Sequence, residues 1–351
     1  EIYQCDWSSD VCSSDLFSYQ FSEDVFKKMT IVPDGKSHGL VLFLDWSGSM
    51  TLHIQHTVKQ LFALTAFCKK VNIPFEVYAF VDNRSFTNNY KQQYKKNDVI
   101  LNNFTLVNIL SSRMSAMDYS KAGALLTCFS MEPKNYYKVP AFMGMAGTPL
   151  NEAIIAAFEL IPQFKEKYKL QIVNAVLLTD GQGHALTGKF IDVNNVQRIT
   201  DASGSACSDV VFCDPVTKQQ VKIPYKESWS GDRQTGALLK LLKARTGANV
   251  MGFYILRVAD FSHEARRLWP ASANFDALKA EFRTNKYSIA KALGFDEYYL
   301  LKSDKKDLED DDEEFETKSN TTRGLVSAFK KYTGGKVSSK IVLNRFIGLI
   351  A

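Results

Sequence analysis

The chain has 351 residues, of which 45% are hydrophobic and 23% are charged, and its formal net charge is +5. This composition is ordinary for a globular protein and allows a well-buried core. No apolar run reaches the roughly 18–20 residues of a membrane-spanning helix, and the basic residues are scattered rather than gathered in a stripe. We therefore expect neither a membrane nor a nucleic acid as a partner.

The first residues do not resemble natural protein sequence. Residues 6–16 read DWSSDVCSSDL, which resembles the translation of a sequencing-library adapter. We interpret residues 1–16 as an artefact and leave them out of the fold reasoning. Four cysteines then remain, and Cys68 and Cys128 lie in apolar, helix-like stretches where we expect core thiols. This is not a disulfide framework, so a reducing compartment is expected.

Strands and helices alternate from the start of the remaining chain. Residues 39–45 read GLVLFLD, a continuous apolar run that is typical of a parallel strand buried on both faces. Apolar residues at helical spacing follow within residues 52–70, and a second strand is predicted over residues 75–81. This order of strand, helix and strand is a βαβ unit. The polar residues 83–98 are interpreted as a surface loop.

The alternation continues toward the C-terminus. Thr148 and Pro149 are expected to open a helix, because threonine is a good N-cap and proline suits the first helical position. The other elements predicted are strands over 104–109, 170–179 and 248–256, and helices over 119–129, 149–164 and 275–293. The fold class predicted is α/β, with a doubly wound, mostly parallel, Rossmann-like sheet flanked by helices.

We expect one α/β domain over residues 17–302. Residues 182–246 are interpreted as an insertion in it, with a hairpin formed by 210–213 and 220–225 and a helix over 233–243. An acidic linker is predicted over 303–322, and a C-terminal helical segment over 323–351.

Three polar segments stand at predicted strand and helix ends. Asp45-Trp46-Ser47-Gly48-Ser49 follows the first strand, Thr148 precedes a helix, and Asp180 follows a later strand. Strand carboxyl ends and helix amino ends share one edge of a parallel sheet, so these oxygens are expected to converge. They suit a hard cation such as Mg²⁺ or Mn²⁺, which oxygen ligands hold octahedrally at about 2.0–2.1 Å.

This set resembles the metal-ion-dependent adhesion site of von Willebrand factor A (VWA) domains. The resemblance implies that Ser47, Ser49 and Thr148 supply hydroxyl ligands, while Asp45 and Asp180 act mostly through bound water. An ion held in this way keeps much of its charge and an open position. It would therefore attract an Asp or Glu side chain of a partner protein.

The stretch LVLFLDWSGSM, followed by a helix and IPFEVYAF, is similar to the VWA-bearing subunit of cobaltochelatase and to its relatives in tailed phages. This similarity implies a metal-dependent interaction module that works with a MoxR-type AAA+ ATPase or its client. It implies an accessory subunit of an ATP-dependent, chelatase-like complex, not catalytic by itself, in the cytoplasm of a bacterium or of a phage-infected cell.

Other functions remain open on the sequence alone. A structural or adhesive virion protein is the main alternative. A hydrolase such as a peptidase would need a base paired with Ser47 or Ser49, and no such pairing is evident. A zinc site from His184, Cys207 and Cys213 would need closer cysteine spacing. No GxxxxGK[ST] phosphate loop is present in the sequence, so nucleotide hydrolysis by this chain itself is not expected.

Overall fold

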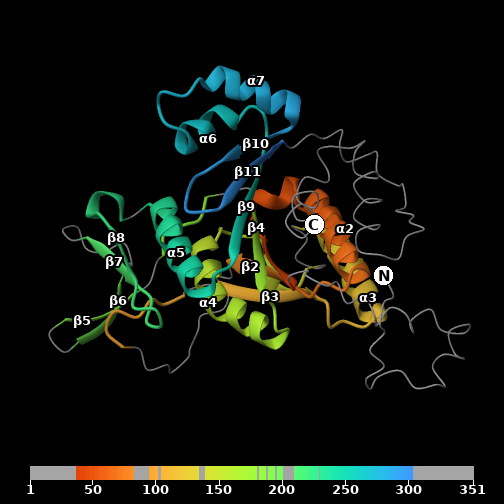
Figure 1. The fold of residues 1–351 in the computed structure, drawn as a ribbon, viewed down its shortest axis with the longest axis horizontal. Helices are drawn as coiled ribbons and strands as arrows, with labels where there is room; N and C mark the ends of the chain where they lie inside the picture. The colour runs from red at the N-terminus through yellow and green to blue at the C-terminus, as the bar shows by residue number, and fades with distance from the viewer. Residues whose placement is uncertain are drawn as a thin grey trace, which may run out of the picture.

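A seven-stranded sheet runs through the molecule in the strand order β10-β11-β9-β4-β1-β2-β3 (Figure 1). The computed structural model describes residues 37–82, 95–101, 104–133, 139–179, 182–186, 189–193, 196–200, 209–228 and 230–302. The strands of this sheet are β1 His38–Asp45, β2 Phe75–Asp82, β3 Phe104–Ser111, β4 Ile172–Thr179, β9 Asn249–Leu256, β10 Tyr287–Ala290 and β11 Glu297–Lys302. The five inner strands are parallel, whereas β3 and β10 pair antiparallel at the two edges. The predicted α/β class with a mostly parallel sheet is confirmed.

The central strand β1 is buried on both faces. Leu40, Leu42 and Leu44 belong to the core on one side of the sheet, and Val41 and Phe43 to the core on the other. Successive strand side chains point to opposite faces, so a strand covered on both sides must be apolar throughout. This burial explains the uninterrupted apolar run in the sequence.

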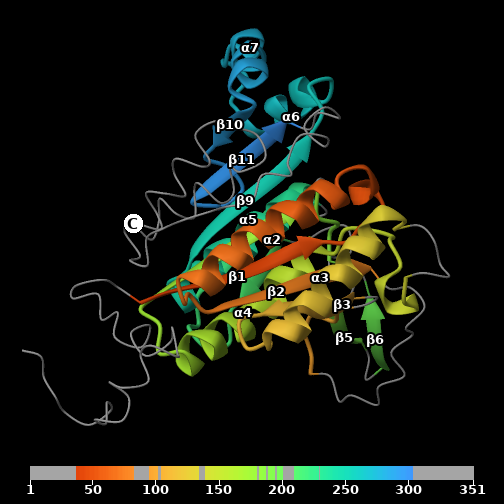
Figure 2. The same ribbon diagram turned by 90° about the vertical axis from the view of Figure 1, so that its right-hand side faces the viewer.

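One face of the sheet is covered by α2 (Ile54–Lys70) and α3 (Ala116–Met131) (Figures 1 and 2). The short 3-10 helix η2 (Ser49–Leu52) leads from β1 into α2. The buried residues of α2 recur at helical spacing and form its core-facing stripe: Ile54, Val58, Leu61, Leu64 and Cys68.

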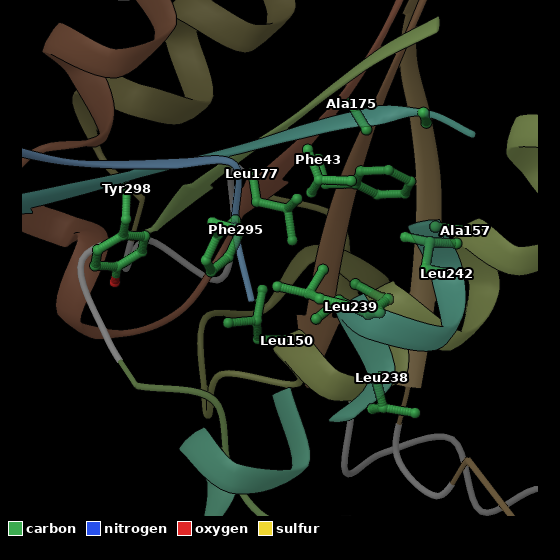
Figure 3. Close-up of a cluster of buried hydrophobic side chains, with 14 of the residues drawn as sticks. Phe43, Leu150, Ala157, Ala175, Leu177, Leu238, Leu239, Leu242, Phe295 and Tyr298 are labelled. Carbon is green, nitrogen blue, oxygen red and sulfur yellow. The ribbon is translucent and has the colours of Figure 1, made fainter. Parts of the chain in front are cut away.

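The opposite face is covered by α4 (Leu150–Lys167) and α5 (Gly231–Thr246), whose leucines meet Phe43 and Leu177 of the sheet (Figure 3). Two further helices, α6 (Phe261–Leu268) and α7 (Phe275–Asn285), join this core through the stacked rings of Phe261 and Phe282, 4.4 Å apart. The 3-10 helix η4 (Tyr225–Glu227) precedes α5. Helices on both faces make the sheet doubly wound, as predicted.

Two antiparallel hairpins stand outside the main sheet: β5 (Lys189–Val193) with β6 (Val196–Thr200), and β7 (Val210–Cys213) with β8 (Gln220–Ile223). The hairpin predicted within residues 210–225 is confirmed. Helix α5 lies in the segment predicted as an insertion, but it packs against α4 and β9. It is therefore the crossover helix between the parallel strands β4 and β9.

Several local predictions are wrong. Pro149, not Thr148, occupies the N-cap of α4, and no side chain caps this helix. The helix predicted over residues 275–293 ends at Asn285, because Lys286 adopts a left-handed conformation with φ 64° and the chain enters β10. Cys128 is exposed rather than in the core, whereas Cys68 is buried as predicted.

The N-terminal segment, most of the polar loop, the acidic linker and the C-terminal helical segment of the predictions lie outside the described residues. Within the part of the chain that the structure describes, no helix is both long enough and apolar enough to cross a membrane.

Candidate metal centre at the carboxyl edge of the sheet

The candidate site lies where the chain order of the sheet reverses. Strand β1 has β2 on one side and β4 on the other, and all three run parallel. Helix α2, which connects β1 to β2, covers one face of the sheet. Helix α4, which leads into β4, covers the other face. Such a switch point leaves a crevice outside the strand ends, where α/β proteins bind ligands. Asp45 ends β1 and Thr179 ends β4 at this point.

The loop after β1 is held firmly in place. Trp46 is fully buried and its indole Nε1 donates a hydrogen bond of 2.9 Å to the carbonyl oxygen of Met143. Ser47 forms a parallel bridge with Ala146, and the Gly48 amide donates to the Ala146 carbonyl at 2.9 Å. The serine loop and the segment that precedes Thr148 therefore lie side by side.

The two serines of this loop bring their hydroxyl oxygens together. Ser47 Oγ and Ser49 Oγ are 3.1 Å apart, and Ser47 is buried. Two neighbouring ligands of an octahedral ion with bonds of 2.0–2.1 Å lie roughly 2.9 Å apart. The separation in the loop therefore fits two adjacent Mg²⁺ ligands without rearrangement of the backbone.

Asp45, two residues before Ser47, is fully buried. Its Oδ2 accepts a hydrogen bond of 2.6 Å from Thr179 Oγ1 at the end of β4. A hydroxyl donor on a carboxylate fixes the orientation of the carboxylate, which is the usual role of a residue behind a metal ligand. Thr179 was not among the predicted site residues, although it immediately precedes Asp180 in the sequence.

Thr148 is also buried, at 6% exposure, directly before α4. Its carbonyl oxygen accepts from the amides of Leu150 and His184. The preceding Gly147 amide donates to Asp82 Oδ2 at 2.9 Å. Asp82 ends β2 and was missed by the sequence analysis, although a carboxylate at a strand end is the signal that singled out Asp45.

The absence of a side chain at Gly147 lets neighbouring groups approach the backbone closely. A Cβ atom built on it would lie 2.5 Å from Asp82 Oδ2 and 2.7 Å from His184 Cε1. The carboxylate of Asp82 and the imidazole of His184 thus both adjoin the backbone that carries Thr148. This close approach explains why glycine precedes the threonine.

The structure places four of the five predicted ligands in two adjoining segments: Asp45, Ser47, Ser49 and Thr148. The fifth, Asp180, lies outside the described residues. Among described residues no group of three His, Cys, Asp or Glu side chains is arranged to hold a metal ion. The candidate ligands that the described residues bring together are hydroxyl groups and separate carboxylates, which suit a hard cation.

Glu152 in the first turn of α4 adds a further buried acid. Burial and, to a smaller extent, the neighbouring charge of Asp82 raise the pKa of its carboxyl to about 7, although a hydrogen bond from its own backbone amide lowers it. This edge of the sheet therefore holds more acid groups than the sequence analysis assigned to it.

The fold and this edge together define an α/β protein with a hydroxyl-rich candidate site at the carboxyl ends of parallel strands. No protein-family model matches the chain, and no curated protein matches it in sequence.

Among the solved structures that the chain resembles are three remote likenesses. The pilus adhesin SpaC of Lactobacillus rhamnosus GG, in its open conformation, aligns over 72% of this chain and 30% of its own, with 13% identity and a TM-score of 0.38. The human COPII-coat protein Sec24c aligns over 73% of this chain and 33% of its own, with 13% identity and a TM-score of 0.31. Three N-terminal domains of the type V pili tip protein Mfa5 of Porphyromonas gingivalis align over 86% of this chain and 41% of their own, with 11% identity and a TM-score of 0.27. This chain spans less than half of each of these structures, and the assignment of class rests on the sheet itself.

Proposed function

We propose that this chain is a metal-dependent protein-interaction module of the VWA type. In this proposal Ser47, Ser49 and Thr148 hold a Mg²⁺ or Mn²⁺ ion through their hydroxyl groups, and Asp45 and Asp180 act mainly through water. The observation that carries the proposal is the 3.1 Å separation of the two serine hydroxyls at the switch point, in a loop that begins with a buried carboxylate.

The chemistry of these donors determines what the ion could do. Hydroxyl ligands are neutral, so the ion would retain most of its positive charge. A carboxylate of a partner protein would complete its coordination and gain a strong electrostatic attraction. The role of the ion is then to bridge two proteins, and the proposal assigns no reaction to the site.

Exposed apolar side chains flank the candidate site. Leu52, at the end of η2, is 72% exposed, and Phe142, in the 3-10 helix η3 (Ala141–Met143), is 40% exposed. The hydrogen bond from Trp46 to Met143 and that from Thr51 Oγ1 to Met145 Sδ at 3.6 Å join the two segments that contain these short helices. A charged centre with apolar neighbours is typical of a protein interface. The partner proposed is therefore an acidic residue flanked by apolar side chains.

The partner proposed is a MoxR-type AAA+ ATPase or a client of that ATPase, on the strength of the sequence resemblance. The test is a pull-down from the native host with purified chain, in Mg²⁺ and in EDTA, with Asp45→Ala as the matched control. Recovery of an ATPase by the wild type in Mg²⁺ alone supports the proposal. Recovery of virion or surface proteins favours the structural or adhesive alternative. Binding that neither EDTA nor Asp45→Ala reduces overturns the metal-dependent function.

A further inference from the structure

The first turn of α4 contains an acid in an unusual position. Glu152 is the third residue of this 18-residue helix, and Thr148 lies two residues before the helix begins. Acids near a helix N-terminus are common because the helix dipole favours them, but they are commonly solvated. Glu152 is 4% exposed, and its Oε2 atom is buried without a hydrogen-bond partner among the described residues.

A second carboxylate contacts the backbone just before Thr148. Asp82, at the end of β2, accepts a hydrogen bond from the Gly147 amide, one residue before Thr148. Its negative charge acts on Glu152, because it raises the pKa of that carboxyl. Neighbouring acids repel each other, and Glu152 Oε2 has no hydrogen-bond partner among the described residues. Buried polar atoms in native proteins normally have a partner, so a cation or its bound water is the kind of group this arrangement lacks.

A structural role alone does not account for this arrangement. The acids Asp214 and Asp232, which are also buried or nearly so, are both paired with arginine. A glutamine or a leucine at position 152 would meet the needs of the helix without burying an acid. What distinguishes Glu152 from the paired acids is its place beside the segment 146–148 that adjoins the serine loop.

We infer that Glu152 belongs to the cation site and accepts a hydrogen bond from a water bound to the ion that Ser47, Ser49 and Thr148 hold. This inference rests on the proposed function and adds a residue to it. Glu152 is a positioning residue for the hydrated ion rather than a direct ligand. Its charge would also offset that of the ion without occupying the coordination position open to the partner.

The test is isothermal titration calorimetry of the full chain with MgCl₂, comparing wild type with Glu152→Gln. The substitution keeps the shape of the side chain and removes its charge. Loss of a residue behind a metal ligand typically weakens metal affinity 10- to 100-fold, and a loss in this range is expected. The matched control is Glu166→Gln, an exposed acid near the other end of the same helix. It should bind Mg²⁺ as the wild type does.

Thermal unfolding without metal separates this role from a structural one. Glu152→Gln should unfold at or above the wild-type temperature in EDTA and gain less from added Mg²⁺. If Glu152→Gln does not fold, Glu152→Asp, which shortens the side chain by one methylene, takes its place in the same titration. Wild-type affinity in the folded variant overturns the role of Glu152 and leaves the proposed function intact. Absence of Mg²⁺ binding by the wild type overturns both.

Discussion

Thr179 Oγ1 donates a hydrogen bond of 2.6 Å to Asp45 Oδ2, and this bond joins the carboxyl ends of two neighbouring parallel strands, β4 and β1. Both residues are buried, at 2% and 0% exposure. A hydrogen bond to a charged group in a buried setting is stronger than one between neutral groups. The bond therefore fixes the carboxylate at the start of the serine loop before any ion is bound.

Replacement of this donor should weaken metal binding without disturbing the ligands. Thr179→Val keeps the shape of the side chain but removes the hydroxyl that donates to Asp45 Oδ2, so the carboxylate is less well oriented. We expect Mg²⁺ affinity to fall about 10- to 100-fold in a calorimetric titration. Thr127→Val removes an exposed hydroxyl that bonds only within α3, and it should leave affinity unchanged. If Thr179→Val and Thr127→Val bind Mg²⁺ with equal affinity, Asp45 does not belong to the metal site.

Loss of a ligand should have a larger effect than loss of a supporting residue. Ser47→Ala removes one of the two hydroxyls that lie 3.1 Å apart, and the small change in volume should leave the fold intact. We expect no measurable Mg²⁺ binding at millimolar concentration and an unchanged circular dichroism spectrum. Ser120→Ala, on the exposed side of α3, serves as the control. Normal binding by Ser47→Ala would show that the site is assigned wrongly.

Acid stability should depend on a residue far from this site. Asp214 is buried in the β7–β8 turn, where it accepts hydrogen bonds from Thr217, Val216 and Arg245. Burial raises the pKa of its carboxyl, but these hydrogen bonds outweigh burial and lower the pKa to about 2. The unfolded value is about 3.9, so the stabilisation is fully present above pH 4 and is lost as the pH falls toward 2.

The corresponding variant is Asp214→Asn, which should lower the free energy of unfolding by about 1–2 kcal/mol at pH 7. The difference from wild type should shrink between pH 4 and pH 2, measured by urea denaturation at each pH. Glu166→Gln, an exposed acid on α4, should track the wild type throughout. A difference that is constant with pH would mean that the ionised form of Asp214 is not what stabilises the turn.

The sequence predicts the centre of this fold well and its edge poorly. Strands β1, β2, β4 and β9 are buried on both faces, so their apolar runs are visible without any tertiary information. The second half of the region predicted as one helix instead forms β10, which pairs with β11. Lys286 ends α7 in a left-handed conformation that glycine usually adopts, so the sequence contains no stop signal there.

Part of the candidate site could be predicted from the sequence and part could not. The motif Asp-x-Ser-x-Ser is local, and the two serines meet within one loop, so their proximity follows from spacing alone. The contacts of Asp82 with Gly147 and of Thr179 with Asp45 join residues 65 and 134 positions apart. They depend on strand order, which no local pattern reveals. Glu152 could not be predicted, because an acid in the first turn of a helix ordinarily faces water.

The apolar side chains beside the site lead to a prediction that separates partner binding from metal binding. Leu52 and Phe142 expose large apolar surfaces next to the serine loop but are not oxygen donors. Replacing both with serine should therefore leave Mg²⁺ affinity unchanged and weaken partner binding by more than tenfold, because buried apolar residues at an interface commonly contribute over 1 kcal/mol each. Val216→Ser, at an exposed turn of the β7–β8 hairpin, is the control for general loss of apolar surface. The measurement is surface plasmon resonance against the partner recovered in the pull-down. If the double variant binds the partner as tightly as wild type does, the interface does not include these two residues, and the partner must approach the ion from another side.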